Sequence, residues 1–333
     1  MKQKIPAITT IRLIVQWAFL AWCIFLGIQF GLFVSHFESF GQTAYYGRPP
    51  GVEGFLPIGA LVSFKNWISS GQIDPVHPAA LVLLLTFVAM ALLAKKSFCS
   101  WLCPVGTLEE GLWKVGRKLF GRNFRIWRWL DLTLSFTRYA LLFFFIKTIL
   151  IDMPVLAVQS FLNAPYWAIA DIKMLHFFTA PSTTSIIVIT LLSLLSVFYK
   201  NVWCRYLCPY GALLGLFSML SPLKIRRNHS TCINCGTCSK ACPALIDVQH
   251  KTTVHSPECT ACLTCVGSCP APGALDIGLS KPNRTIPGWG FALFVLLIFT
   301  AGVCFGMLTG HWETALTYDD YRALIPQTSR FGH

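Results

Sequence analysis

The sequence predicts an all-α multi-pass membrane protein with about five transmembrane helices and a hydrophilic, cysteine-rich insert between the fourth and the fifth. Three observations lead to this fold class. Of the 333 residues, 54% are hydrophobic and only 12% are charged, whereas soluble domains average about 25% charged residues. Five apolar segments approach the roughly 20 residues that cross a bilayer core. All but two of the 14 cysteines fall into four short, regular motifs.

The predicted transmembrane helices cover residues 11–34, 78–94, 132–151, 184–202 and 288–308. The second and the fourth are short, and we expect the Cys-Pro segments that follow them to complete them as further helical turns. The basic N-terminus is similar to the start of a signal peptide, but the apolar run behind it is too long and no small-x-small cleavage site follows. The first segment is therefore predicted to be an uncleaved transmembrane helix.

The distribution of Lys and Arg predicts the orientation of these helices. Three cations precede or open the first segment, eight lie in residues 95–128 and nine in residues 200–284, whereas residues 35–77, residues 152–183 and the tail after residue 308 hold five together. The positive-inside rule then places the N-terminus and both cysteine-rich regions in the cytoplasm, and the tail in the periplasm, of a bacterial inner membrane. Topology and contact with anionic lipid account for the net charge of +13, so no nucleic-acid partner is expected.

The hydrophilic insert contains the strings CINCGTCSKACP and CTACLTCVGSCP. Each reads Cys-x2-Cys-x2-Cys-x3-Cys-Pro, the spacing of bacterial two-cluster ferredoxins, in which the fourth cysteine of each run binds the other cluster. Zinc ribbons favour paired Cys-x2-Cys motifs and cytoplasmic thiols stay reduced, so zinc and disulfides are weaker alternatives. The spacing predicts two 4Fe–4S clusters, one bound by Cys232, Cys235, Cys238 and Cys269, and the other by Cys259, Cys262, Cys265 and Cys242.

The strings CSWLCP and CRYLCP follow the second and fourth apolar segments and mark an internal duplication. Cysteines four residues apart share one face of a helix, with Cβ atoms roughly 5–6 Å apart. If the two repeats pack together, their four thiols converge on one site at the membrane surface. Three interpretations are open: a third iron–sulfur cluster, which the repetition favours; redox-active thiols or a transient metal relay; and small cysteines that only pack a turn. The residues concerned are Cys99, Cys103, Cys204 and Cys208.

With these motifs in this order, the chain resembles the membrane-bound polyferredoxins of the NapH/NosR type. The match covers residues 81–277 and rests on the cysteines of the four motifs. The resemblance implies electron transfer between the quinone pool, or cytoplasmic carriers, and a membrane or periplasmic redox partner such as a cytochrome or an iron–sulfur subunit. NosR-type proteins carry a periplasmic flavin domain before the first helix, and copper-reducing CcoG-like relatives carry an immunoglobulin-like domain after the ferredoxin. NapH-type chains usually end after the ferredoxin, so this chain is similar to NapH with an added helix and an external tail.

Four parts are predicted along the chain. Residues 1–222 form a four-helix membrane domain with the two Cys-x3-Cys-Pro repeats, and residues 223–284 form the cytoplasmic two-cluster ferredoxin. Residues 285–309 form the fifth transmembrane helix, and residues 310–333 form an extracytoplasmic tail that either docks a partner or is loosely ordered.

Polar residues expected on the outer face suggest a second site. The apolar stretch 55–68 is predicted to lie in the membrane interface, where Lys65 or His77 would hydrogen-bond a quinone; an interfacial helix that only covers the bundle is the plainer alternative. His36, His77 and His176 fall near this face and suggest a metal or haem site, although single histidines at interfaces are usually polar caps.

Charges inside a membrane segment are functional candidates by default. The third apolar segment contains Arg138 near its inner end and Lys147 near its outer end, close to Asp152. Snorkelling towards the two interfaces accounts for both side chains.

Two classes of function follow. The first is an electron-transfer subunit with quinol-dehydrogenase activity inside a complex, and the alternative is a reductase of metal ions such as copper, or a maturation factor that supplies electrons for cofactor assembly. A redox sensor is a further alternative. The sequence contains no nucleophile–base pair, phosphate loop or dinucleotide glycine fingerprint, so no catalytic residue is assigned.

Overall fold

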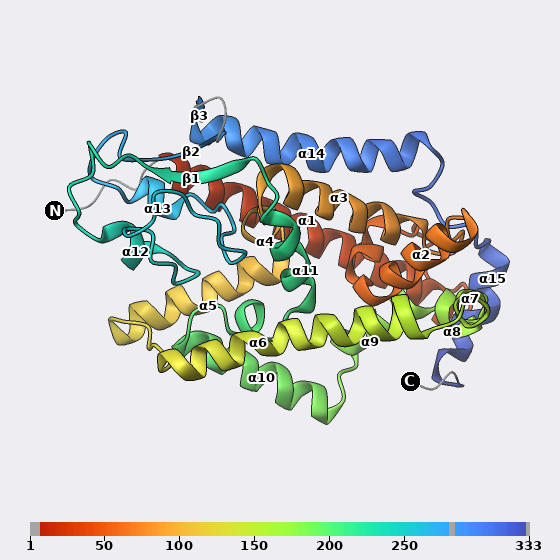
Figure 1. The fold of residues 1–333 in the computed structure, drawn as a ribbon. Coiled ribbons are helices and arrows are strands. Elements are labelled where there is room, and N and C mark those ends of the chain that lie inside the picture. Colours follow the sequence, from red (N-terminus) through yellow and green to blue (C-terminus); the bar gives the residue numbers. More distant parts are fainter. Residues whose placement is uncertain (1–6, 280–283, 331–333) are drawn as a thin grey trace. The chain divides into compact units, whose positions relative to one another are not determined.

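The chain folds mainly into helices, with a small antiparallel sheet in its cysteine-rich part (Figure 1). The computed structural model describes residues 7–279 and 284–330. The chain divides into two units, and several long helices contribute residues to both. Unit 1 consists of Met1–Leu20, Phe87–Leu142 and Leu191–Thr300, and unit 2 consists of Ala21–Thr86, Phe143–Thr190 and Ala301–His333.

The five predicted membrane segments are largely helical, but they differ in length. Among the described residues, three helices are long and apolar enough to cross a membrane, or four if a pair that is bent by 71° counts as one span. The three are α1 (Ala7–Glu38), α6 (Arg128–Phe145) with its π-helical continuation η2 (Ile146–Asp152), and α14 (Gly288–Leu308). The bent pair is α9 (Ala170–Thr179) and α10 (Thr183–Phe198), and the short apolar helix is α3 (Pro78–Ala94).

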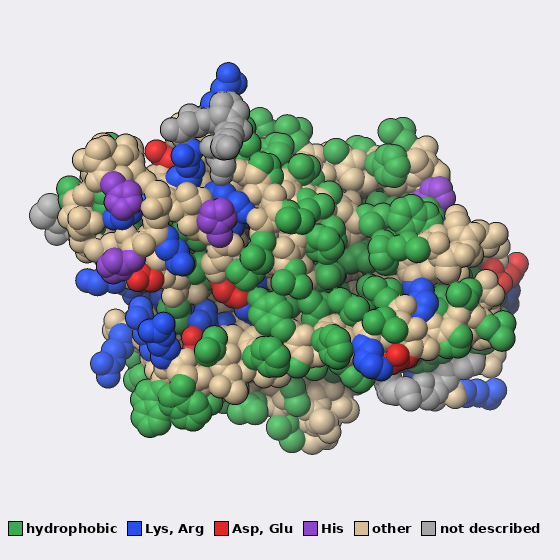
Figure 2. Space-filling model, viewed as in Figure 1, with side chains coloured by type: hydrophobic (Ala, Val, Ile, Leu, Met, Phe, Trp, Pro, Cys, Tyr) green, Lys and Arg blue, Asp and Glu red, His purple; other side chains and the backbone are tan. Residues whose placement is uncertain are grey.

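Large apolar side chains on these helices are exposed. The exposed fraction is 53% for Trp22 on α1, 65% for Phe143 on α6 and 57% for Leu297 on α14. Figure 2 shows hydrophobic side chains over much of the visible face, whereas Lys and Arg gather at the left of the view. A soluble protein rarely exposes so much contiguous apolar surface, which indicates contact with lipid.

The two Cys-x3-Cys segments are helical, but they do not continue α3 and α10 as the sequence led us to expect. Lys95 (φ 57°) and Asn201 (φ 54°) adopt left-handed backbone conformations, which end the preceding helices. The chain then forms the single turn α4 (Phe98–Trp101) in the first repeat and the π-helix η3 (Trp203–Leu207) in the second.

A helix follows each of these turns and begins in the same way. Cys103 and Cys208 are the N-cap residues of α5 (Pro104–Phe120) and α11 (Pro209–Ser218), and a proline occupies the first helical position of each. Proline is favoured there because its missing N–H would have no partner in the helix. The Cys-Pro pair therefore sets the start of the helix in both repeats.

The insert adds strands to the predicted helical fold. Strands β1 (Leu223–Arg227), β2 (Leu275–Leu279) and β3 (Arg284–Ile286) form an antiparallel sheet in the order β1-β2-β3. Ile225 pairs with Ile277, and Ile277 also pairs with Ile286. Short helices α12 (Thr237–Ala241) and α13 (Thr264–Gly267) each carry the third cysteine of a ferredoxin motif.

Unit 2 has its own apolar core, into which the C-terminal tail packs. Tyr321 and Ile325 are only 4% and 1% exposed and join a cluster with Phe33 and Phe37 of α1. Residues 318–325 of the tail are therefore packed in unit 2 rather than loosely ordered, and docking to a partner stays a prediction. The remaining elements of this unit are η1 (Pro50–Phe55), α2 (Pro57–Ser70), α7 (Val155–Leu162), α8 (Pro165–Ala168), α15 (Tyr318–Leu324) and η4 (Ile325–Arg330).

Candidate metal centres

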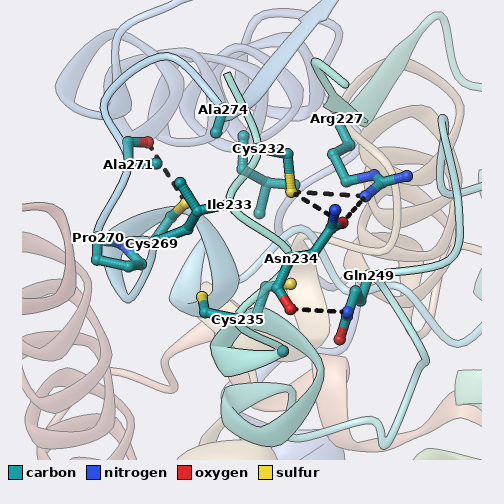
Figure 3. A pocket seen from close by; sticks show the side chains of 13 residues that line it. Arg227, Cys232, Ile233, Asn234, Cys235, Gln249, Cys269, Pro270, Ala271 and Ala274 are labelled. Atoms are coloured by element: carbon teal, nitrogen blue, oxygen red, sulfur yellow. Dashed lines mark hydrogen bonds between the residues drawn. The ribbon is translucent and has the colours of Figure 1, made fainter. Parts of the chain in front are cut away.

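The first ferredoxin motif winds around a small hollow that is open to solvent. Asn234 (φ 55°) and Gly236 (φ 72°) are left-handed, and this alternation curls the chain so that its cysteines face the hollow. Figure 3 shows Cys232 beside Arg227, whose Nη1 lies 3.5 Å from the Cys232 Sγ. The cysteines that line the hollow are Cys232, Cys235, Cys238 and Cys269.

The second motif repeats this geometry in the protein interior. Ala261 (φ 47°) and Leu263 (φ 55°) are left-handed at the positions that match Asn234 and Gly236. The cysteines that act electrostatically on one another here are Cys242, Cys259, Cys262 and Cys265. The structure therefore groups the eight thiols as the crossed pairing requires, with Cys269 beside the first triple and Cys242 beside the second.

The two groups differ in burial and in the pKa of their thiols. Burial raises the pKa of Cys242 to about 12 and that of Cys265 well above its ordinary value. The pKa of Cys232 is lowered, first by the hydrogen bond from the backbone N–H of Asn234 and then by Arg227. Because metal ligands must be deprotonated, the buried group needs a bound cation to lose its protons.

The two Cys-x3-Cys repeats also bring their thiols together. Cys103 interacts electrostatically with Cys99 and Cys208, and Cys204 interacts with Cys208 and Cys103. The four side chains lie inside unit 1, where Tyr210 interacts with three of them. We call Cys99, Cys103, Cys204 and Cys208 the membrane quartet.

Buried cations accompany two of the three groups of thiols. Lys95 is fully buried and acts on Cys259, and Arg12, which is 2% exposed, acts on Cys262. Lys96 is 5% exposed and acts on Cys99 and Cys208. Burying cations in a protein interior is costly unless negative charge compensates them. Arg12 already pairs with Glu110, so Lys95 and Lys96 are the cations that favour a negatively charged group at the thiols.

Unpartnered donors beside the cysteines fit the same chemistry. Within the described residues, these buried donors have no hydrogen-bond partner, and each belongs to a side chain next to one of the thiol groups: Arg12 Nε, Arg138 Nε, Arg227 Nε and Thr264 Oγ1. The described residues contain no group of three or more His, Cys, Asp or Glu that could hold a single metal ion. A four-iron cluster would spread its thiolates farther apart than one ion does, and its sulfur atoms would offer acceptors near these donors.

Two models of iron–sulfur proteins match the chain at these residues. The 4Fe-4S binding domain matches residues 76–123 and 182–228, and each match contains one Cys-x3-Cys-Pro motif. The 4Fe-4S dicluster domain matches residues 224–270. No solved structure matches the chain.

Relatives that align with 61–98% of the chain agree with these matches. The ferredoxin-type protein NapH of Escherichia coli is 24% identical over 254 residues, 73% of this chain and 80% of NapH. The regulatory protein NosR of Pseudomonas aeruginosa is 27% identical over 226 residues, 61% of this chain and 30% of NosR. The putative electron transport protein YccM of E. coli is 44% identical over 330 residues, 98% of this chain and 92% of that relative. The chain belongs to the NapH/NosR-type membrane-bound polyferredoxins.

This polyferredoxin is therefore an iron–sulfur electron-transport protein of the membrane, as its sequence predicts. Sequence reasoning missed several charged residues that organise the membrane quartet. Glu109 on α5 is 4% exposed and accepts hydrogen bonds from the backbone N–H groups of Trp203 (2.7 Å) and Cys204 (3.1 Å). Glu110 forms an ion pair with Arg12 at 2.6 Å. The sequence does contain a sign of these residues, because the two repeats differ here: Glu109 and Glu110 occupy the positions of Leu214 and Gly215 in the second repeat.

The expectation that Arg138 snorkels towards the membrane interface is wrong. It is 1% exposed, forms an ion pair with Glu258, and its Nη1 lies 3.4 Å from the carbonyl oxygen of Cys204. Lys147 forms an exposed ion pair with Asp152, in agreement with its predicted place near the helix end. The arginine is held by the polyferredoxin's own acidic residue rather than by the membrane interface.

The four outer-face candidates of the polyferredoxin lie in unit 2 and each has a separate partner. Lys65 donates to the carbonyl oxygens of Leu150 and Met153. His36 contacts the carbonyl of Thr43 at 2.6 Å and the hydroxyl of Tyr318 at 2.8 Å.

The other two outer-face candidates are histidines whose rings lie beside carboxylates. His77 is fully buried, with Nδ1 3.3 Å from Glu53 and Nε2 2.8 Å from the carbonyl of Trp167. His176 pairs with Glu38 at 3.1 Å on the surface. The structure thus does not bring the four candidates together into one site.

Proposed function

We propose that this polyferredoxin is a membrane electron-transfer subunit that links the quinone/quinol pool, or cytoplasmic carriers, to a membrane or periplasmic redox partner, with quinol-dehydrogenase activity inside a complex. The observation that carries the proposal is the gathering of three four-cysteine groups within unit 1, each beside a buried cation or arginine. When bound, 4Fe–4S clusters supply one-electron transfer. The resemblance to NapH and NosR supports the link to quinone.

The proposed ligands follow the grouping of the thiols. One cluster would be held by Cys232, Cys235, Cys238 and Cys269, a second by Cys242, Cys259, Cys262 and Cys265, and a third by the membrane quartet. Four thiolates around each cluster leave no iron open for a substrate, which favours electron transfer over reactions on an iron-bound substrate. The protein residues hold, shield and charge-compensate these groups.

The proposed topology has five spans. The bent pair α9 and α10 would contribute one span, and the short apolar helix α3 would contribute another. The N-terminus and the ferredoxin at residues 223–284 would lie in the cytoplasm, with residues 310–333 in the periplasm. Alkaline phosphatase and green fluorescent protein fused after Gly71, after Arg122 and at the C-terminus test this arrangement, because each reporter is active on one side only.

Anaerobic purification followed by iron and sulfide analysis and EPR tests the proposed clusters. Wild-type protein is expected to hold about twelve irons, because three clusters of four irons are proposed. Cys99→Ser and Cys204→Ser should remove one cluster, and Cys262→Ser should remove a different one. If the wild type holds only two clusters, and neither Cys99→Ser nor Cys204→Ser changes them, the proposed third cluster does not exist. If the protein holds no iron even after reconstitution, the whole proposal is overturned.

The quinone link needs its own experiment. In anaerobic vesicles, a short-chain quinol should reduce the clusters of the wild-type protein, which is seen as bleaching of their visible absorbance. If quinol fails and Cu(II) reoxidises dithionite-reduced protein within the mixing time, the alternative of a metal-ion reductase replaces quinol oxidation.

A further inference from the structure

Two consecutive lysines at the end of α3 serve different groups of thiols. Lys95 adopts a left-handed backbone conformation (φ 57°), and the side chains of the two lysines have different neighbours. The Lys95 Nζ lies 3.2 Å from the carbonyl oxygen of Val254 and acts on Cys259, in the second ferredoxin motif. Lys96 lies instead at the membrane quartet, because a Cβ placed on Gly211 would be 3.4 Å from the Lys96 Nζ and 3.5 Å from the Cys208 Sγ. Both cations are buried, so one short segment brings positive charge to two thiol groups.

The first membrane repeat is hydrogen-bonded to the second ferredoxin motif. Ser100 Oγ donates to the carbonyl of Thr260 at 2.7 Å, and Trp101 Nε1 donates to the carbonyl of Ala261 at 3.1 Å. Ser100 and Trp101 directly follow Cys99, and Thr260 and Ala261 directly follow Cys259. Trp101 is fully buried, so this contact is part of the core of unit 1.

The second membrane repeat reaches the same thiol group. Arg205, which directly follows Cys204, donates through Nη1 to the carbonyl of Ala244 at 2.8 Å, two residues after Cys242. Arg138 links the carbonyl of Cys204 to Glu258, which directly precedes Cys259.

The contacts of both membrane repeats lead to the same group of ferredoxin thiols. The hydrogen bonds that Ser100, Trp101 and Arg205 donate to the ferredoxin end within two residues of Cys242 or Cys259. The group with Cys232 instead lines the surface hollow, and Cys235 in it is exposed. The contacts therefore define an order: membrane quartet, buried ferredoxin group, surface ferredoxin group.

We infer that electrons pass between the membrane quartet and the ferredoxin through the cluster of Cys242, Cys259, Cys262 and Cys265, and that Lys96 and Arg138 are positioning residues that raise the potential of the group held by the membrane quartet. The inference rests on the proposed third cluster. Each transfer moves one electron from one 4Fe–4S cluster to the next, and no proton or bond changes place. The surface cluster at Cys232 then exchanges electrons with a soluble carrier.

Redox titration followed by EPR tests the role of the two lysines in the intact protein. A nearby cation stabilises the reduced, more negative cluster, so Lys96→Gln should lower the reduction equilibrium constant of the membrane cluster about tenfold, which is about 59 mV for one electron. Lys95→Gln should shift the cluster at Cys259 instead. Lys118→Gln, a change of an exposed lysine on α5, is the matched control and should shift neither. Unchanged potentials in the Lys96 variant, with iron content intact, would overturn the assignment.

The role of Arg138 cannot be tested with Arg138→Gln alone, because this variant leaves the Glu258 carboxylate without its cation and can misfold for that reason. The double variant Arg138→Gln/Glu258→Gln removes both charges, and Arg138→Lys keeps the positive charge. The lysine variant should retain the potential of the membrane cluster, whereas the double variant should lower it with the same iron content. Equal potentials in the wild type and the double variant would contradict a role for Arg138 beyond folding.

Spin coupling tests the order of the groups. In the fully reduced protein, Cys204→Ser should narrow the EPR signal of the cluster at Cys259 and leave that of the cluster at Cys232 unchanged. Narrowing of the Cys232 signal alone would reverse the order and overturn the route. If the wild type holds no iron at the membrane quartet, the proposed third cluster itself fails, which iron analysis distinguishes from a wrong order.

Discussion

Glu109, on the helix that follows the first Cys-x3-Cys motif, accepts a hydrogen bond from the backbone N–H of Cys204, in the second motif, at 3.1 Å. The same carboxylate accepts from the N–H of Trp203 and from the hydroxyl of Ser196. One repeat therefore satisfies the backbone donors that begin the helical turn of the other. This explains how two sequence repeats separated by about a hundred residues form one four-thiol site.

Glu109→Ala should loosen the contact between the second Cys-x3-Cys repeat and α5. Removing the Glu109 carboxylate leaves two buried backbone N–H groups and a hydroxyl without acceptors. Each buried unsatisfied group costs about 1–3 kcal/mol of folding stability. We expect a lower unfolding temperature and loss of iron from the membrane quartet, with both ferredoxin clusters retained. Thermal unfolding and EPR measure these effects. Glu313→Ala, on the exposed tail, is the control, and equal iron contents in the two variants would contradict this role of Glu109.

Gly236→Ala should damage the first ferredoxin motif. Gly236 has φ 72°, and a Cβ there would lie 2.8 Å from the Gln249 Oε1. Gly273 provides a matched control, because it has φ 69° but open space around the Cβ position. Both alanines incur the left-handed backbone cost of about 1–2 kcal/mol, so only the collision with Gln249 distinguishes them. Iron analysis after reconstitution should show a larger loss for Gly236→Ala, and equal losses would rule out the collision as the cause.

The sequence predicted the features that depend on spacing. The helical positions of the apolar segments, the ferredoxin motifs and the polyferredoxin family follow from hydropathy and cysteine intervals, and family comparisons confirm the last two. The domain boundaries and the ligand roles of the cysteines stay predictions. The positions of Cys242 and Cys269 beside the opposite triples agree with the predicted grouping.

The features that sequence reasoning missed depend on long-range contacts of single charges. Arg138 looked like a snorkelling side chain, because hydropathy cannot show that Glu258, 120 residues away, lies beside it. The left-handed Lys95 was missed for a similar reason, since lysine carries no local signal for that conformation. The sequence placed His77 at the outer face as a partner for a quinone, and it could not show that the side chain is buried against Glu53 and Trp167, because these residues lie in other segments.

Arg48→Met should strongly destabilise unit 2. The guanidinium of Arg48 forms ion pairs with Glu53 at 2.9 Å and Asp171 at 2.7 Å, and both carboxylates are buried. Removing one partner of a buried pair costs about 3–5 kcal/mol, because the remaining charge is left without compensation. The unfolding temperature in detergent should fall well below that of Arg322→Met, a change on the exposed surface of α15. A triple variant that also carries Glu53→Gln and Asp171→Asn should recover part of the loss, and no recovery would show that packing rather than charge is responsible.

His77 should make the stability of unit 2 depend on pH. Burial alone would lower the pKa of His77, but the hydrogen bond to Glu53 and the charges of Asp171 and Glu53 outweigh burial and the opposing charge of Arg48, so the pKa is raised above 6.5. A raised pKa in the folded state means that the protonated imidazole stabilises the fold fully below pH 6.5, and that this contribution is lost as the pH rises through the folded value. The unfolding temperature of the wild type should therefore fall as the pH increases above 6.5, and His77→Gln should remove this slope. His250→Gln, a change of an exposed histidine that pairs with Asp247, should leave the slope unchanged. Parallel pH profiles for the wild type and His77→Gln would show that the imidazole is neutral in the folded protein.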